Sequence, residues 1–492
     1  MGEIRRRRPS IRPLVVARAF SAGITLLIPV VLARALSVSD YGTFKQFFLV
    51  SSTLYLVLGL GVPQSLYYFL PRAEPGERRA LLFHTLAFLA IFGALGALAV
   101  FWADPALEAL GGAPLSRVAL PLALYLWFFL GAGALEPGLT AQGRPGAAAV
   151  SYVVSDSLRA SAFILPVLSG GGLSSSLWGA VAFASLRFAA AWLVLLWRTE
   201  GPFLRPALLG KQLRYAFPYG GAMLVAMPQQ QLHQYAVSLT SSPAAFAIYS
   251  VGCFNLPLVD LLYTPTTEIL MYRLGEIERE GRRKEEAIHA FRDAVAKLAL
   301  AFFPLALGLF AIAPSFLSLL YGPAYVESAP ILRVALGMVV LSILPVDGVL
   351  RAKAKTRLLF FSYLAKIALS VPLVFGFLFA LGPIGAMVGF ILTEAIHKSL
   401  LLVFAARALS EGPGGLRAVL PIRSIGTAAL AGGLALLLVA GARALLPMEP
   451  LLAVVFHGGL FGLAYLGGLS AGGVPIASLW ALLSRRAGAD EH

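Results

Sequence analysis

The side chains best suited to chemistry in this sequence are ionisable groups that stand inside long apolar runs. The deepest of them are carboxylates, arginines and lysines at seven positions: Asp156, Arg159, Arg187, Asp260, Lys366, Glu394 and Lys398. A charge placed at the centre of a lipid bilayer costs at least ~2.5–3.5 kcal/mol on insertion scales. Each group therefore needs an ionic partner, a hydrated cavity or a route to the surface.

Four of these seven residues form two pairs with the spacing of neighbours on one helical face. Asp156 and Arg159 are three residues apart, Glu394 and Lys398 four, so each pair can neutralise itself. They are either intrahelical ion pairs that hold a bundle together or the lining of a hydrated cavity. In the second case, Asp156 and Glu394 are candidates for coupling to H⁺ or Na⁺. The neighbouring His397 is more simply explained as a structural histidine.

Three further bases have no acid nearby in the sequence: Arg18, Arg187 and Lys366. Arg18 lies close enough to a membrane surface to reach it, whereas Arg187 is deep. A guanidinium in a cavity is well suited to bind a pyrophosphate through two parallel hydrogen bonds. We therefore predict a cationic binding site for an anionic headgroup, made by Arg18 and Arg187 together with Arg159 and Lys366.

A cluster of amides marks a later apolar run, where residues 227–235 read MPQQQLHQY. These polar side chains cover nearly every direction of a helix, so they cannot all face lipid. They either line a cavity, where amides suit sugar hydroxyls, or hydrogen-bond to neighbouring helices. We favour the cavity, with the candidates Gln229, Gln230, His233 and Gln234.

The elements that position these groups are predicted to be transmembrane helices. Of the 492 residues, 59% are hydrophobic and 13% charged, and the mean hydropathy is +0.82. A soluble globule carries about 25% charged residues, and a helix crosses the hydrocarbon in about 20 apolar residues. We expect an all-α polytopic protein with about fourteen spans, at residues 14–36, 43–70, 80–103, 118–140, 147–168, 174–197, 215–238, 245–270, 298–320, 329–350, 358–380, 384–406, 423–444 and 450–470.

The distribution of basic residues predicts the orientation. Of the 39 Lys and Arg residues, 29 fall in loops on the side of the N-terminus and one, Arg117, on the opposite side. Loops rich in Lys and Arg stay in the cytoplasm, so both termini are expected there. The formal charge of +15 is spread over short clusters between the apolar runs. That pattern argues against a nucleic-acid partner.

A weak internal repeat divides the chain. Residues 36–72 and 239–273 each join a small polar turn to an aromatic residue, a long apolar run and an aromatic-basic end. The offset equals six spans, so the halves would be parallel repeats about an axis along the membrane normal. We predict six-helix lobes at 1–200 and 201–421, followed at 422–492 by two additional helices and a cytoplasmic tail.

The residues around the first turn resemble a known family. Residues 32–44, LARALSVSDYGTF, and the continuation at 59–62 and 70–72 are similar to the start of the polysaccharide/oligosaccharide (O-antigen, Wzx-type) flippase family. This family belongs to the multidrug/oligosaccharidyl-lipid/polysaccharide exporter superfamily. The six-plus-six arrangement, with a long basic loop after the eighth span, is also similar. In the second half, residues 242–246 (SPAAF) stand where the family more usually has an acidic-aromatic-glycine turn.

The resemblance implies both a fold and a function. It implies two six-helix lobes around a central cavity, alternating access, and translocation of a polyprenyl-pyrophosphate-linked oligosaccharide from the inner to the outer leaflet. The substrate would be a precursor of cell-surface polysaccharide. The expected location is the cytoplasmic (inner) membrane of a prokaryote, and a monomer is expected. Expected partners are membrane lipids and, beyond them, a polysaccharide polymerase or glycosyltransferases.

Several functions compete with this one. A drug/cation antiporter of the same superfamily would favour a deep acidic site, whereas bases outnumber acids within the spans. A non-transporting scaffold for polysaccharide assembly would not need deep arginines. An enzyme is not expected, because the sequence contains no phosphate-binding loop, no HExxH motif and no nucleophile elbow. No cofactor is expected beyond a coupling ion, H⁺ or Na⁺.

Overall fold

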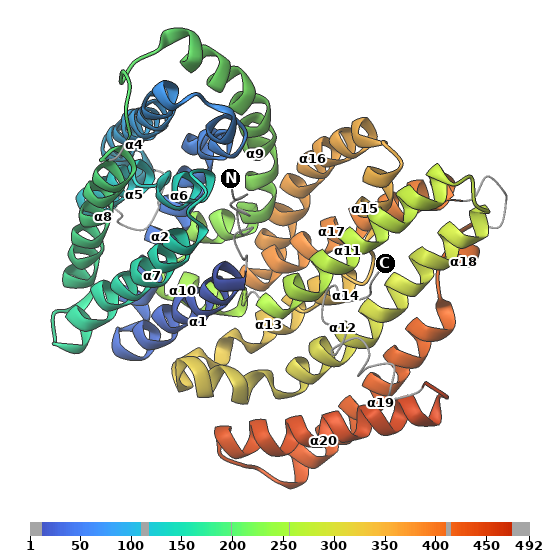
Figure 1. Ribbon diagram of the computed structural model, residues 1–492. Coiled ribbons are helices and arrows are strands. Elements are labelled where there is room, and N and C mark those ends of the chain that lie inside the picture. Colours follow the sequence, from blue (N-terminus) through green and yellow to red (C-terminus); the bar gives the residue numbers. More distant parts are fainter. Residues whose placement is uncertain (1–11, 110–117, 198, 255, 410–414, 475–492) are drawn as a thin grey trace, which may run out of the picture. The chain divides into compact units, whose positions relative to one another are not determined.

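The computed structural model describes residues 12–109, 118–197, 199–254, 256–409 and 415–474. All regular secondary structure within these ranges is helical, as Figure 1 shows. The predicted cytoplasmic tail lies largely outside them. The chain divides into two compact units, Met1–Ala247 and Ile248–His492. The predicted lobe boundaries at residues 200 and 421 stay a prediction.

The first unit consists of helices of very different length. They are α1 (Arg12–Ala35), α2 (Val38–Gly59), α3 (Val62–Phe69), η1 (Leu70–Arg72), η2 (Pro75–Glu77), α4 (Arg78–Ala109), α5 (Ala119–Gly131), α6 (Leu135–Ala141), α7 (Pro145–Leu168), α8 (Gly172–Leu196) and α9 (Pro206–Thr240). The main pairings are α4 with α5, α1 with α7, α7 with α8, and α2 with α9. Helix α10 (Pro243–Gly252) crosses the boundary between the units.

The second unit continues the helical pattern. It contains α11 (Pro257–Arg279), α12 (Lys284–Tyr321), η4 (Pro323–Ser328), α13 (Ala329–Ala335), α14 (Gly337–Leu341), α15 (Val346–Ala352), α16 (Thr356–Leu381), α17 (Pro383–Leu409), α18 (Gly415–Val419), α19 (Ile422–Leu445) and α20 (Pro450–Ala471). Helices α16 and α17 form one antiparallel pair, and α19 and α20 form another that packs on α12.

Each of the fourteen predicted spans coincides with helix, but their number as membrane spans is not confirmed. Ten helices in the described ranges are long and apolar enough to cross a membrane, and twelve if the two bent pairs, α2–α3 and α10–α11, each count as one span. The other two predictions fall on α1 and α9. The described apolar part of α1 is only Gly23–Ala35, and α9 carries the glutamine cluster.

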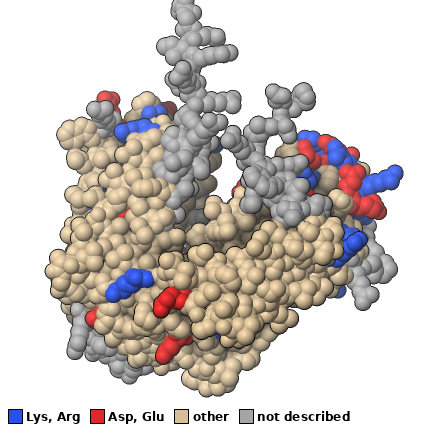
Figure 2. Space-filling model, turned by 90° about the horizontal axis from the view of Figure 1, so that it is seen from below, with Lys and Arg blue, Asp and Glu red and all other residues tan. Residues whose placement is uncertain are grey.

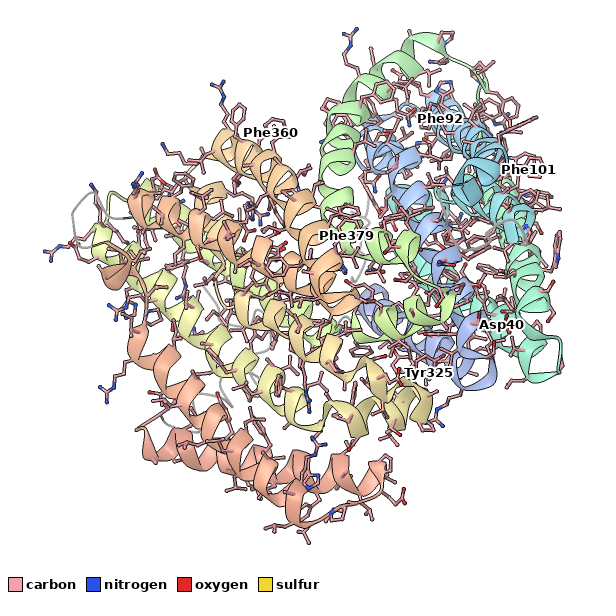
Figure 3. The ribbon with its side chains drawn as sticks, turned by 180° about the vertical axis from the view of Figure 1, so that it is seen from behind. Asp40, Phe92, Phe101, Tyr325, Phe360 and Phe379 are labelled. Carbon is pink, nitrogen blue, oxygen red and sulfur yellow. The ribbon has the colours of Figure 1, made fainter. Side chains whose placement is uncertain are left out.

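The surface of these helices is apolar where a soluble protein would be charged. Leu437 on α19 and Leu463 on α20 are 70% and 73% exposed. Phe360 and Phe379 on α16, labelled in Figure 3, are 51% and 77% exposed. Figure 2 shows a face that is mostly uncharged. Contiguous apolar surface on this scale marks contact with a partner or with lipid. Together with the span lengths, it identifies a multi-pass membrane protein.

Helix α2 begins at a cap, ends at a bend and approaches the end of the first unit closely at one point. Ser37 caps α2, with the Asp40 backbone N–H donating to its Oγ at 3.1 Å. A Cβ on Gly42 would lie 1.8 Å from the carbonyl oxygen of Pro243, so only glycine allows the two turns of the repeat to meet. At the other end, Leu60 (φ 45°) bends the chain by 44° between α2 and α3.

Candidate functional site

Arg187 on α8 is bound by an acid from another helix. Its Nη2 donates to Glu136 Oε2 on α6 at 2.6 Å, and Ser151 Oγ on α7 donates to Glu136 Oε1 at 2.9 Å. The guanidinium also lies 5.2 Å from the centre of the Phe129 ring. The expectation that Arg187 has no acidic partner is therefore wrong. Packing of α6, α7 and α8 brings Glu136 to it across 51 residues of sequence.

The predicted pair on α7 is confirmed. Arg159 Nη2 lies 2.9 Å from Asp156 Oδ1, one turn earlier on the same helix. The same nitrogen donates to Thr25 Oγ1 on α1 at 2.7 Å. The ion pair thus also joins α7 to α1, a role that helical spacing alone does not reveal.

Each of the two guanidinium groups has an N–H that makes no hydrogen bond within the described part of the chain. The side chains of Arg159 and Arg187 are 17% and 13% exposed, and in the described part of the chain each has a buried Nε without a hydrogen-bond partner. An unsatisfied buried donor costs about 1–3 kcal/mol. Because both Nε atoms are buried, an anion would receive these hydrogen bonds only after the surrounding side chains move.

The structure separates the four α9 candidates by exposure. Gln229 and His233 are buried, at 3% and 4% exposure, whereas Gln230 is exposed and Gln234 is half-buried. Residues 229 and 233 are four apart and so share one face of the helix. The remaining face of this segment is open for hydrogen bonding through Gln230.

Part of the polar surface of α9 joins it to α2. The Gln231 side chain is hydrogen-bonded to Thr53, and Tyr235 Oη donates to the Leu49 carbonyl at 3.3 Å. One turn further on, Gln46 Nε2 on α2 donates to Ser238 Oγ at 3.1 Å. Hydrogen bonding to a neighbouring helix thus applies to Gln231, and the cavity lining by the four candidates stays a prediction. Gln231 was not among the candidates, although the matching polar positions on α2 signal a polar helix interface.

The second unit contains a buried ion pair between α16 and α17. Lys366 Nζ binds Glu394 Oε1, and these side chains are only 6% and 7% exposed. Two expectations are corrected here: Lys366 has an acidic partner, and Glu394 pairs with it rather than with Lys398. Helices α16 and α17 pack closely along their length, so the partner from the facing helix is nearer than the one along the same helix.

Lys398 belongs to a second polar group. Its Nζ lies 3.2 Å from the Leu344 carbonyl oxygen and 3.4 Å from Tyr263 Oη on α11. Tyr263 in turn donates to Asp347 Oδ1 on α15 at 2.5 Å, and Arg351 binds the same carboxylate. This chain of contacts ties α11, α15 and α17 together.

The remaining ionisable candidates take no part in these groups. His397, one turn after Glu394, is buried, and its Nε2 lies 3.2 Å from Ser362 Oγ. Asp260 is exposed on α11. Arg18 is on α1, but its side chain lies outside the described residues.

The comparisons with known proteins place the chain in a family. Residues 31–330 match the model of the polysaccharide biosynthesis protein family. The chain belongs to this family. No curated protein matches the sequence significantly.

Solved structures of transporters share the fold of this polysaccharide biosynthesis protein. The lipid II flippase MurJ, in an inward closed conformation, is similar with a TM-score of 0.74 at 15% identity, covering 94% of this chain and 98% of that one. An inward-facing multidrug resistance MATE transporter of the MOP superfamily gives 0.63 at 13% identity, covering 81% and 98%. An outward-facing MATE transporter gives 0.51 at 15%, covering 81% and 94%.

These findings confirm the family resemblance and the all-helical transporter fold. The neighbours are a flippase and transporters, and none is an enzyme. The expectation of a transport protein rather than an enzyme is consistent with this family and with the fold shared with these neighbours. The fold exists in inward- and outward-facing forms, which is what alternating access requires.

Proposed function

We propose that this protein translocates a polyprenyl-pyrophosphate-linked oligosaccharide, a precursor of cell-surface polysaccharide, from the inner to the outer leaflet of the cytoplasmic membrane by alternating access. Family membership supports a role in polysaccharide biosynthesis, and the MurJ-like fold supports a lipid-linked substrate. The distribution of basic loops supports cytoplasmic termini. We further propose a monomer that receives its substrate from glycosyltransferases and delivers it to a polymerase.

The observation that carries the proposal is the state of the two deep arginines in the first unit. Arg187 and Arg159 are held in place by carboxylates, yet each retains a buried N–H that the protein does not satisfy. A pyrophosphate offers several acceptor oxygens and binds guanidinium groups bidentately. Arg18, on the helix that Thr25 joins to Arg159, is the third member of this proposed site.

The saccharide part of the substrate requires neutral polar contacts. Gln230 and Gln234, with Gln229 and His233 on the adjoining face of α9, are the proposed contacts with sugar hydroxyls. Amides donate and accept hydrogen bonds, as hydroxyls do, so one helix face can accommodate different sugars.

The second unit supplies the proposed coupling group. Glu394 is buried against Lys366, and both can change protonation state, whereas an arginine stays charged. We propose that binding of H⁺ or Na⁺ at Glu394 competes with Lys366 and so alters the packing of α16 on α17. Lys366 then acts on the coupling ion rather than on the substrate, while Asp156 remains the alternative coupling carboxylate.

The direct test is translocation in proteoliposomes. A fluorescent polyprenyl-pyrophosphate oligosaccharide is incorporated, and a membrane-impermeant quencher reports the fraction in the outer leaflet over time. Protein-dependent flipping of this lipid, and none of a neutral polyprenyl glycoside, is expected. Equal flipping of both lipids would contradict a pyrophosphate site. Efflux of organic cations without lipid flipping would instead indicate an antiporter. Absence of both activities would favour the non-transporting scaffold.

A further inference from the structure

An apolar groove runs along α7 and α8 in the first unit. It has a volume of about 280 Å³ and is lined mostly by aliphatic side chains, several of them exposed, including Val150, Val154 and Leu158 on α7 and Leu186 on α8. Arg187 reaches its wall but is bound to Glu136. Apart from Arg187 and, at one end, Arg144, the groove is lined by uncharged side chains.

The groove continues into a polar pocket at one end. This second pocket, of about 380 Å³, is lined by Arg78 at the start of α4, Arg144 before α7, and Thr199 and Glu200 after α8. Arg144 and Val194 line both cavities, so the two cavities adjoin each other. We call the combined feature the α7–α8 groove. The groove is charged at one end and mostly apolar along the rest, which matches the charged headgroup and the apolar chains of a lipid.

The charged groups of this pocket are available for a ligand. Among the described residues, Arg78, Arg144 and Glu200 have no side-chain hydrogen bond or ion pair within the protein. Neighbouring basic residues differ: Arg79 donates to the Gly201 carbonyl at 3.2 Å, and Arg205 lies 3.3 Å from Glu77. These contacts tie the loop after α8 to the start of α4. The pocket is thus preformed while its own charges stay unpaired.

The length of the groove fits one leaflet. From Arg144 to Leu158 it follows fourteen residues of α7, which is about 21 Å at a rise of 1.5 Å per residue. Half of a bilayer of about 40–45 Å, headgroup regions included, is about 20–22 Å. A chain that starts at the arginines therefore remains within the leaflet on the arginine-rich side, with its end at the bilayer centre.

We infer that the α7–α8 groove binds a single phospholipid, with its phosphate against Arg78 and Arg144 and one acyl chain between α7 and α8. Glu200 beside the arginines suits a headgroup that carries an ammonium, as phosphatidylethanolamine does. The same carboxylate repels a doubly charged pyrophosphate. The occupant is therefore a resident membrane lipid rather than the proposed substrate.

The test measures lipid retained by the purified full-length protein. The protein is equilibrated with vesicles of phosphatidylethanolamine and phosphatidylglycerol, and bound lipid is counted by native mass spectrometry. The double variant Arg78→Ala/Arg144→Ala is expected to retain at most about one tenth of the phosphatidylethanolamine that the wild-type protein retains. Glu200→Gln is expected to shift retention from phosphatidylethanolamine toward phosphatidylglycerol. Val154→Trp, which fills the apolar part without a change of charge, is expected to lower retention of both.

A matched control separates this site from general electrostatics. Arg283→Ala/Arg292→Ala removes the same charge from exposed positions on and beside α12 and is expected to leave retention unchanged. Equal loss in the two double variants, or unchanged retention in Arg78→Ala/Arg144→Ala, would overturn the inference. So would displacement of the retained phospholipid by polyprenyl pyrophosphate, because the groove would then serve the substrate. Each result is independent of whether the protein flips lipids.

Discussion

The two units hold their deep charges in different ways. In the first, arginines pair with Glu136 and Asp156, stay 13–17% exposed and keep unsatisfied N–H groups. In the second, Lys366 and Glu394 bury each other to 6–7% exposure. An arginine cannot lose its proton in a protein, whereas lysine and glutamate can. The first arrangement suits permanent attraction of an anion, and the second suits a switch that depends on an ion.

The aromatic surroundings sharpen this difference. Arg187 lies over Phe129, which stacks on Tyr125 and contacts Tyr55 at 5.3 Å between ring centres. Such rings stabilise a cation without neutralising it. In the second unit, Lys366 instead binds the carboxylate of Glu394, and His397, one turn after Glu394, lies 3.2 Å from Ser362 Oγ through its Nε2. Arg187 of the first unit thus lies against an aromatic ring as well as a carboxylate, whereas Lys366 and Glu394 of the second unit neutralise each other.

The largest predicted effect comes from breaking the pair in the second unit. Lys366→Met leaves Glu394 buried without a partner and is expected to destabilise the protein by about 3–5 kcal/mol. Thermal unfolding in detergent measures it. The double variant Lys366→Met/Glu394→Met is expected to recover most of that stability. A single variant as stable as wild type would show that the pair is not desolvated, and the contrast between the units would fail.

The next effect concerns coupling. Glu394→Gln keeps the size of the side chain and removes its charge, so the flipping rate is expected to lose its dependence on the pH or Na⁺ gradient. Basal exchange without a gradient is expected to remain. Asp156→Asn serves as the comparison in the first unit. If Asp156→Asn abolishes gradient dependence and Glu394→Gln does not, the coupling carboxylate is Asp156 in the first unit.

A smaller effect is expected at the interface of α2 and α9. The hydrogen bond between Thr53 and Gln231 is part-buried, and such a bond contributes about 0.5–1.5 kcal/mol. A double-mutant cycle with Thr53→Val and Gln231→Leu should give a coupling energy in that range. A flipping defect larger than the loss of stability would indicate that Gln231, rather than Gln230 or Gln234, contacts the saccharide.

The smallest effect belongs to the charged turn after α11. Hydrogen bonds from Arg279 and Arg282 lower the pKa of Glu280, which is exposed. Any stabilisation is present above the pKa of unfolded glutamate and is lost as the pH falls through the lower folded value. Glu280→Gln is expected to leave flipping unchanged and to alter the melting temperature only slightly. A clear flipping defect would place a functional contact outside the membrane helices.

The sequence predicted helices and local pairs better than tertiary partners. Apolar length located helix at every predicted span, and three-residue spacing identified the Asp156–Arg159 pair. It missed Glu136 for Arg187 and Glu394 for Lys366, because those partners come from other helices, 51 and 28 residues away. Spacing along one helix contains no information on which faces meet. Glu136 comes from α6, which packs against α7 and α8.

The central claim is that the deep arginines of the first unit bind the pyrophosphate of the substrate. Glu136→Gln/Arg187→Gln removes both charges of one pair, so no buried charge is left alone. Flipping of the labelled polyprenyl-pyrophosphate oligosaccharide in proteoliposomes should then fall about 10–100-fold, as expected for loss of a charged hydrogen bond of about 1.5–3 kcal/mol. Arg187→Lys should give an intermediate rate. Wild-type flipping by a folded double variant would contradict the claim.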